Sequence, residues 1–174
     1  MVYVFLVNQC ELVEAMTPID LLRRAQIDVK VISLENETFV KTSSDIVIKA
    51  DEIFDIDNIT DVSALILPGG PGVSGYSLEP RLKELILHEY NKGTLISAIC
   101  AAPTYLESIG IKFEGTAYPK VSDKLSNYVN KRVHVDKNVI TGEALGSSIE
   151  FSLEIIKYLT DENTANQVAQ AIYQ

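Results

Sequence analysis

The sequence contains few of the residues that build disulfide frameworks and basic binding surfaces. Its 174 residues include two cysteines, and 15 Lys and Arg face 24 Asp and Glu, for a net charge of −9. No basic cluster exceeds Arg23-Arg24 or Lys131-Arg132. Nucleic acids and anionic membranes bind concentrated positive charge, so we expect neither as a partner. Two cysteines behind no recognisable leader favour a reducing cytoplasm over structural disulfides.

Metal and phosphate motifs are missing as well. The two cysteines and two isolated histidines do not have the spacing of a zinc site. The glycine-rich segment 69–75 lacks the lysine of a phosphate-binding P-loop. We therefore expect no metal and no cofactor. With 47% hydrophobic and 22% charged residues, the composition is that of an ordinary globular protein, and the length predicts a single domain over residues 1–174.

Short apolar runs alternate along the chain with segments of helical periodicity. This alternation predicts a doubly wound, mostly parallel sheet between two layers of helices, a three-layer α/β/α sandwich. Pro18 should kink or divide the first helix, and the acidic segment 51–61 reads as a connector. The expected strands are 2–7, 28–34, 64–67, 95–99, 132–135 and 138–141, with an edge hairpin near 38–40 and 45–48. The expected helices are 11–25, 78–91, one ending near 108, 149–159, and one from a cap at Asp161 to 171.

The segment 95–105, LISAICAAPTY, places Cys100 between an apolar strand and a helical run. A nucleophile at a sharp strand-to-helix turn forms a nucleophile elbow, which needs small residues two positions before and after it. Ala98 and Ala102 meet that requirement. The following helix would favour the thiolate form of Cys100 and so lower its pKa. The alternative is a buried structural cysteine at the end of a core strand.

Other chemistry-bearing residues follow strands that should end at the same edge of the sheet. Ligand crevices in such folds lie at the carboxyl ends of the strands. The segments that meet there would bring Cys10, Glu14 and the segment 69–72 toward Cys100, together with residues 142–147. Bare backbone at Gly70, with the amide of Ala101, would suit an oxyanion hole. A plain Gly-Gly turn is the alternative.

Four segments together resemble the ThiJ/PfpI superfamily, in the branch typified by the parkinsonism-associated deglycase, with a class I glutamine amidotransferase-like fold. They are EAMTPIDLLRRA (14–25), LILPGG (65–70), SAICAAPTYL (97–106) and SSIEFSLEII (147–156). The resemblance implies a flavodoxin-like fold and a homodimer. Members of the family are assigned as glyoxalases without cofactor, deglycases, chaperones, oxidative-stress sensors, or amidases and peptidases.

The resemblance also implies roles for individual residues. Cys100 matches the reactive cysteine and Glu14 its glutamate partner, whose protonated carboxyl would donate a hydrogen bond to the sulfur. Like-charge repulsion would raise the pKa of that carboxyl, which could also shuttle a proton. Glu11, in contrast, reads as a solvated helix residue. Cys10 could act as a resolving thiol on the same helical face as Glu14, or could be a buried bystander.

The sequence departs from the family where a histidine is often found. In the aligned segment 116–119 this chain has Tyr118, which could hydrogen-bond a substrate or simply form part of a pocket wall. The position after the cysteine, a histidine in peptidase-like members, is Ala101. His88 reads as a surface helix residue and His134 as a strand residue. A peptidase or amidase is therefore unlikely.

Two functional hypotheses remain open. The first is a cysteine-dependent stress-response enzyme that acts on a small aldehyde or glycated substrate by glyoxalase or deglycase chemistry. Cys100 would add to the carbonyl and Glu14 would move the proton. The second is a non-enzymatic redox sensor or chaperone that uses oxidation of Cys100.

Overall fold

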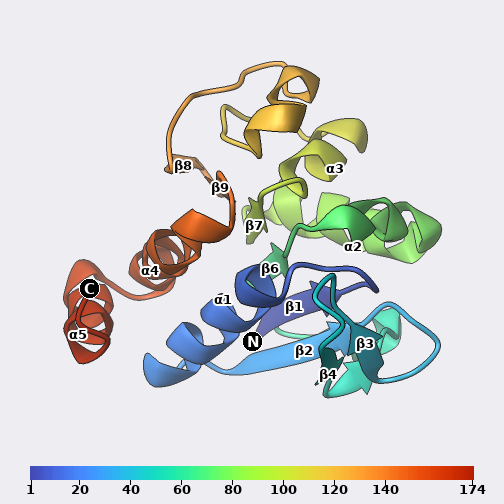
Figure 1. Cartoon of the computed structure of the whole chain (residues 1–174), viewed down its shortest axis with the longest axis horizontal. Coiled ribbons are helices and arrows are strands. Elements are labelled where there is room, and N and C mark those ends of the chain that lie inside the picture. The colour runs from blue at the N-terminus through green and yellow to red at the C-terminus, as the bar shows by residue number, and fades with distance from the viewer.

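A seven-stranded sheet forms the centre of the computed structural model, which describes residues 1–174 (Figure 1). The strand order is β5-β2-β1-β6-β7-β9-β8, and every neighbouring pair is parallel except β8 with β9. Every residue of β1, β6, β7 and β9 is buried, as continuous apolar runs in a parallel sheet require. The strands are β1 Val2–Leu6, β2 Val29–Ser33, β5 Glu52–Ile53, β6 Ala64–Leu67, β7 Leu95–Ile99, β8 Val133–Asp136 and β9 Val139–Gly142.

Helices cover both faces of this sheet. On one side α1 packs against α4, which also contacts α5, while α2 and α3 lie on the other side (Figure 1). The predicted three-layer α/β/α sandwich is confirmed. The helices are α1 Leu12–Arg24, α2 Pro80–Lys92, α3 Pro103–Ser108, α4 Ser148–Leu159 and α5 Glu162–Ala171. None of them is long and apolar enough to cross a membrane.

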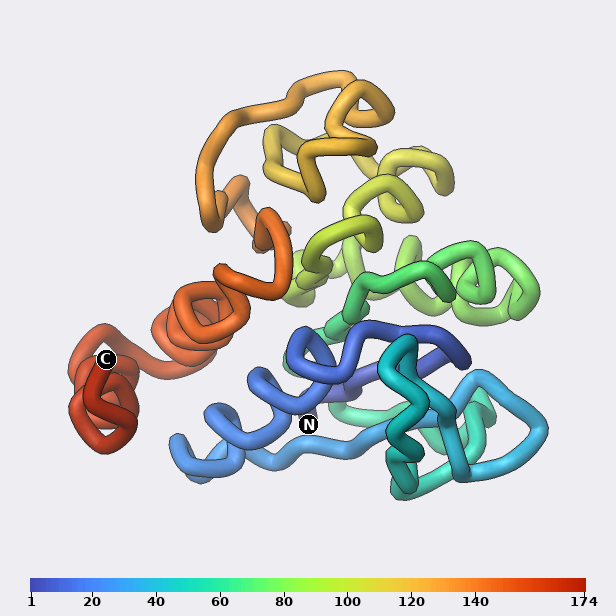
Figure 2. The backbone as a smooth tube through the Cα atoms, viewed as in Figure 1, coloured from blue at the N-terminus to red at the C-terminus, as the bar shows by residue number.

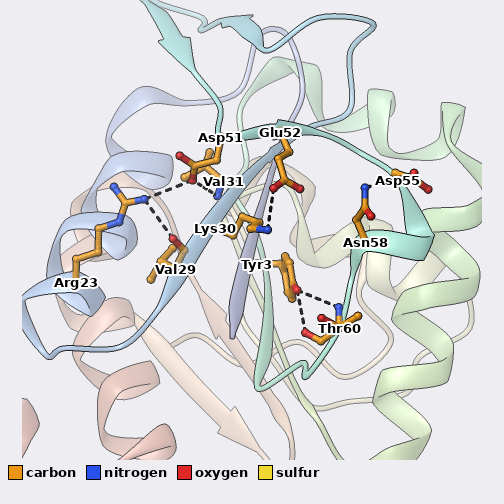
Figure 3. A network of polar contacts seen from close by, with 10 residues as sticks. All are labelled: Tyr3, Arg23, Val29, Lys30, Val31, Asp51, Glu52, Asp55, Asn58 and Thr60. Carbon is orange, nitrogen blue, oxygen red and sulfur yellow. Dashed lines mark hydrogen bonds and ion pairs between the residues drawn. The ribbon is translucent and has the colours of Figure 1, made fainter.

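The edge of the sheet differs from the prediction. The expected hairpin forms, as β3 (Phe39–Lys41) and β4 (Val47–Lys49), but it is a separate two-stranded sheet. The edge position belongs to β5, inside the segment predicted as a connector. Polar contacts hold β5 in place: the Asp51 carboxylate accepts the Val31 amide at 2.8 Å, and Lys30 pairs with Glu52 at 2.8 Å (Figure 3). A two-residue strand held this way has no hydrophobic pattern to detect.

The hairpin instead braces the loop that follows β1. The Gln9 amide donates to the Lys41 carbonyl at 2.7 Å, and the Ser43 amide donates to the Cys10 carbonyl at 2.9 Å. Figure 2 shows the backbone of the hairpin beside this loop. The loop leads directly into α1, so the hairpin helps to fix where α1 begins.

The helix α1 runs through Pro18 without a break, so the predicted division is wrong. Proline removes one backbone donor, yet Pro18 is buried within a helix that packs along α4. Tertiary packing therefore outweighs the local cost of the proline. The helix begins at a cap formed by Glu11, whose carboxylate accepts the Glu14 amide at 2.9 Å.

The predicted cap at Asp161 is confirmed, and two further features complete the chain. Asp161 caps α5 by accepting the Thr164 amide, and Gly93 ends α2 in the left-handed conformation. The segment 112–130 combines loops with a short 3-10 helix, Pro119–Lys124, and an isolated bridge between Gly115 and Tyr128.

Replacing Gly93 tests the importance of that left-handed helix end. Its φ is +86°, and a Cβ there would touch nothing within 4 Å, so only backbone strain opposes a side chain. We expect Gly93→Ala to lower the free energy of unfolding by about 1 kcal/mol, measured by urea denaturation. Gly146→Ala is the matched control, because it also faces open space but lacks a positive φ. Equal effects of the two substitutions would contradict this account.

Candidate functional site

Cys100 lies at a strained turn between β7 and α3. Its φ is +64°, a left-handed conformation that is uncommon for residues other than glycine. Its amide donates to the Gly142 carbonyl at 2.9 Å, which ties the turn to the end of β9. Ala98 and Ala102 are fully buried on either side, where larger residues would push strand and helix apart. The structure therefore has the nucleophile elbow that the sequence predicts.

Glu14 projects from the first turn of α1 into the protein interior. Its side chain is only 1% exposed, and its Oε2 accepts the Gly69 amide at 3.0 Å. The carboxyl lies close enough to the thiol of Cys100 for the two groups to shift the pKa of each other. The predicted pairing of these two residues is thus present in the geometry.

Gly69 lies where these two residues and the end of β6 meet. A Cβ at this position would be 2.6 Å from the Cβ of Cys100 and 2.7 Å from Oε2 of Glu14. Such contacts are far shorter than van der Waals separations, so only glycine fits without displacing the pair.

Burial shapes the protonation of the pair. It raises the pKa of Glu14 to about 7, and the charge of Glu11 raises it further, against the lowering effect of the Cys100 thiol. Burial and the carboxylate of Glu14 raise the pKa of Cys100 to about 12, although the amides of Gly70 and Ala101 lower it. The predicted lowering by the following helix is therefore wrong: α3 has only six residues, and desolvation outweighs the amides of Gly70 and Ala101, which both lie outside it.

The two groups titrate as one coupled unit. Above a pH of about 7 the pair has lost the proton of Glu14, and the remaining proton lies on the Cys100 thiol, whose pKa is about 12. Thiolate character then comes from transfer of the thiol proton to the carboxylate. Glu14 can thus serve as the base for Cys100, a role that a histidine has in many cysteine enzymes.

The pair opens into a cavity of about 430 Å³. Five of the predicted site residues line it together: Glu14, Gly70, Cys100, Ala101 and Tyr118. The sequence reasoning missed Glu11, which lines the cavity and caps α1 and is not a freely solvated residue; its place three residues before Glu14 was the available signal. Pro71, Ala144 and Leu145 complete the wall, the last two within the segment 142–147 that was expected to converge here.

The backbone around the sulfur is arranged for an anion. The amides of Gly70 and Ala101 both face the sulfur and favour its ionised form; Gly70 itself has a φ of +102°, a conformation that favours glycine. Pro71 has no amide to add. Tyr118 is half-buried, and its amide donates to the Cys100 carbonyl at 2.8 Å.

Cys10 does not share the cavity with Cys100. It is fully buried, and burial raises its pKa to about 12. The helix begins only at Leu12, so Cys10 does not occupy the helical position relative to Glu14 that the sequence suggested.

Neither histidine lines the cavity. The side chain of His88 is 70% exposed on α2, whereas that of His134 on β8 is only 11% exposed and its Nε2 lies 3.0 Å from Oε1 of Glu114. No group of three or more His, Cys, Asp or Glu side chains is placed to hold a metal ion.

The fold and this site can be compared with known proteins. A model of the DJ-1/PfpI family matches residues 1–158. This chain belongs to the DJ-1/PfpI family. The Parkinson disease protein 7 homolog of Danio rerio is 34% identical over 174 residues, covering 95% of this chain and 92% of that protein.

Other members of the family extend the comparison. The glutathione-independent glyoxalase DJR-1.2 of Caenorhabditis elegans is 34% identical over 123 residues, covering 68% of this chain and 66% of that protein. The structure of oxidized Toxoplasma gondii DJ-1 superposes with a TM-score of 0.95 at 30% identity, covering 99% of this chain and 97% of that chain. The family includes a protein that is named as an enzyme, and this chain has the fold of the family.

The coupling of Glu14 with Cys100 predicts the pH dependence of the thiol. We expect alkylation of Cys100 to be slow at neutral pH and to accelerate as the pH approaches the thiol pKa of about 12, because burial and the Glu14 carboxylate both oppose the thiolate. In Glu14→Gln the midpoint should move downward, because the carboxylate that raises the pKa of the thiol is gone. Iodoacetamide labelling followed by peptide mass spectrometry measures both midpoints.

Glu154→Gln provides the control, because Glu154 is on α4 and does not line the cavity. Its midpoint should equal that of the unmodified protein. A midpoint in Glu14→Gln equal to or above that of the parent would contradict this coupling of Glu14 with Cys100.

Proposed function

We propose that this protein is a cysteine-dependent enzyme that converts small 2-oxoaldehydes, such as methylglyoxal, to 2-hydroxy acids without a cofactor. The observation that carries the proposal is the close approach of Cys100 and Glu14 at a cavity that no histidine lines. The glyoxalase name of the Caenorhabditis elegans relative supports the same chemistry. The homodimer and the cytoplasmic location expected from the sequence remain predictions.

The first step forms a carbon–sulfur bond. As the sulfur of Cys100 adds to the aldehyde carbon, its proton passes to the Glu14 carboxylate, and the carbonyl electrons move to oxygen. The amides of Gly70 and Ala101 face this region and would stabilise the developing oxyanion, which then takes up a proton to give a hemithioacetal.

The second step moves a proton between adjacent carbons. Glu14, ionised again after protonating the oxyanion, removes the proton from the sulfur-bearing carbon and returns it to the adjacent ketone carbon. In the same rearrangement the hydroxyl proton of the hemithioacetal moves to the former ketone oxygen. A thioester of the 2-hydroxy acid remains on Cys100. Water cleaves the thioester and restores the thiol, so the net reaction adds one water to methylglyoxal and yields lactate.

The pKa of Glu14 suits this exchange. Proton transfer is most efficient when the pKa of the catalytic group lies near the working pH. Burial raises the pKa of Glu14 to about 7, so the carboxyl can both accept and return a proton in neutral solution.

Release of lactate from methylglyoxal tests the proposal. We expect Cys100→Ser to abolish release. Glu14→Gln should reduce kcat by about 100-fold or more, because both proton-transfer steps lose the carboxylate that accepts the proton. Glu154→Gln should retain the parental rate. Lactate release no greater than that of Cys100→Ser would overturn the proposal.

A redox sensor is the second candidate, and two observations favour it. Cys100 is half-buried at an open cavity with two amides facing its sulfur, and the Toxoplasma gondii relative is described as oxidized. We expect mild peroxide to add about 32 Da, two oxygens, to the peptide that contains Cys100. Cys10, which is fully buried, should stay unmodified and is the internal control. Absence of the sulfinate would remove this candidate.

A further inference from the structure

A second cavity of about 500 Å³ adjoins the one that contains Cys100. The two share Gly70, Pro71 and Ala101, so the backbone that faces the sulfur also forms part of the wall of the second space. The lining of this second cavity is rich in hydroxyl groups. Its polar side chains include Ser74, Ser77, Thr104, Tyr105, Glu107 and Ser108.

Two residues of this lining each have a buried polar atom without a partner. The side chain of Tyr105 is 5% exposed and its hydroxyl makes no hydrogen bond. Oε1 of Glu107 accepts from Lys112 at 3.0 Å and from Ser126 at 2.7 Å, but the buried Oε2 has no donor. Leaving a buried polar group unsatisfied costs about 1–3 kcal/mol, and such groups are rare in native proteins.

The protonation states of these two groups are opposite and complementary. Burial raises the pKa of Tyr105 to about 12, so its hydroxyl keeps its proton and can donate. Burial tends to raise the pKa of Glu107, but the bond from Ser126 and the charge of Lys112 lower it, so the carboxylate can only accept.

A chain of hydroxyl groups fits this combination. A ligand hydroxyl can accept a hydrogen bond from Tyr105 and donate one to Glu107. Thr104 and Ser108 donate their hydroxyls to the carbonyls of Ala101 and Tyr105, both at 2.7 Å, and keep lone pairs for further donors. A three-carbon 2-oxoaldehyde bonded to Cys100 has no chain of hydroxyl groups that could reach these residues.

We propose that the second cavity binds the polyhydroxyl chain of sugar-derived 2-oxoaldehydes whose aldehyde carbon reacts at Cys100. The substrate lies across the edge formed by Gly70, Pro71 and Ala101, with its reactive end in one cavity and its hydroxyl chain in the other. This proposal rests on the proposed function and names its substrate class. The reaction is the same addition of one water, and its product is a 3-deoxy sugar acid when the substrate is 3-deoxyglucosone.

Kinetics on two substrates test the inference. For the parent protein, kcat/KM for 3-deoxyglucosone should exceed that for methylglyoxal. Tyr105→Phe and Glu107→Gln should each lower the ratio of the two values about tenfold, chiefly through a higher KM for 3-deoxyglucosone. That is the effect of one lost hydrogen bond of about 1.4 kcal/mol. Tyr158→Phe and Glu154→Gln, both on α4, should leave the ratio at the parental value.

Melting temperature separates binding from folding. Tyr105→Phe removes a hydroxyl that has no partner in the free protein, so the melting temperature should not fall. A lower ratio with an unchanged or higher melting temperature marks a lost ligand contact. An unchanged ratio in both Tyr105→Phe and Glu107→Gln would overturn the inference while leaving the proposed function in place.

Calorimetry with Cys100→Ser makes the binding step independent of turnover. The variant should bind 3-deoxyglucosone more tightly than methylglyoxal, and Tyr105→Phe in the same background should weaken that binding about tenfold. Binding without turnover in the parent protein would remove the proposed function and retain the site for polyhydroxyl chains. Equal binding of the two aldehydes would overturn the site.

Discussion

Three backbone segments meet in tight packing around Gly69. The end of β6, the elbow at Cys100 and the first turn of α1 meet so closely that a single methyl group would not fit between them. The sheet order places β6 between the strands that lead to the other two segments. The glutamate and the cysteine, 86 positions apart in sequence, therefore become one chemical unit because glycine lets them touch.

The linked titration of Glu14 and Cys100 follows from this packing. Isolated in water, a carboxyl and a thiol titrate several pH units apart, but burial raises both and their close approach couples them. Glu11 contributes from the other side: it caps the helix that carries Glu14 and adds a negative charge beside it. The cavity contains no histidine, and its one group with a pKa near neutral is Glu14, whose pKa is raised by burial.

The sequence predicted most of the fold and much of the site, for identifiable reasons. Buried parallel strands such as β6 and β7 are continuous apolar runs with clear ends, so their predicted bounds match. The edge strand β5 is held by Asp51 and Glu52 through specific polar contacts, which leave no periodic trace. The pKa of Cys100 was predicted in the wrong direction because desolvation depends on neighbours distant in sequence. The second cavity was missed because Tyr105 reads as an ordinary helix residue until its hydroxyl is found without a partner.

The left-handed backbone at Cys100 has a consequence for how this sequence can drift. Glycine would adopt the same φ of +64° without strain, so mutation toward a more stable protein leads away from cysteine at this position. A lineage that had no use for the thiol would gain stability by losing it. A cysteine at this position therefore lowers folding stability relative to glycine, because its backbone is held in a conformation that glycine adopts more readily.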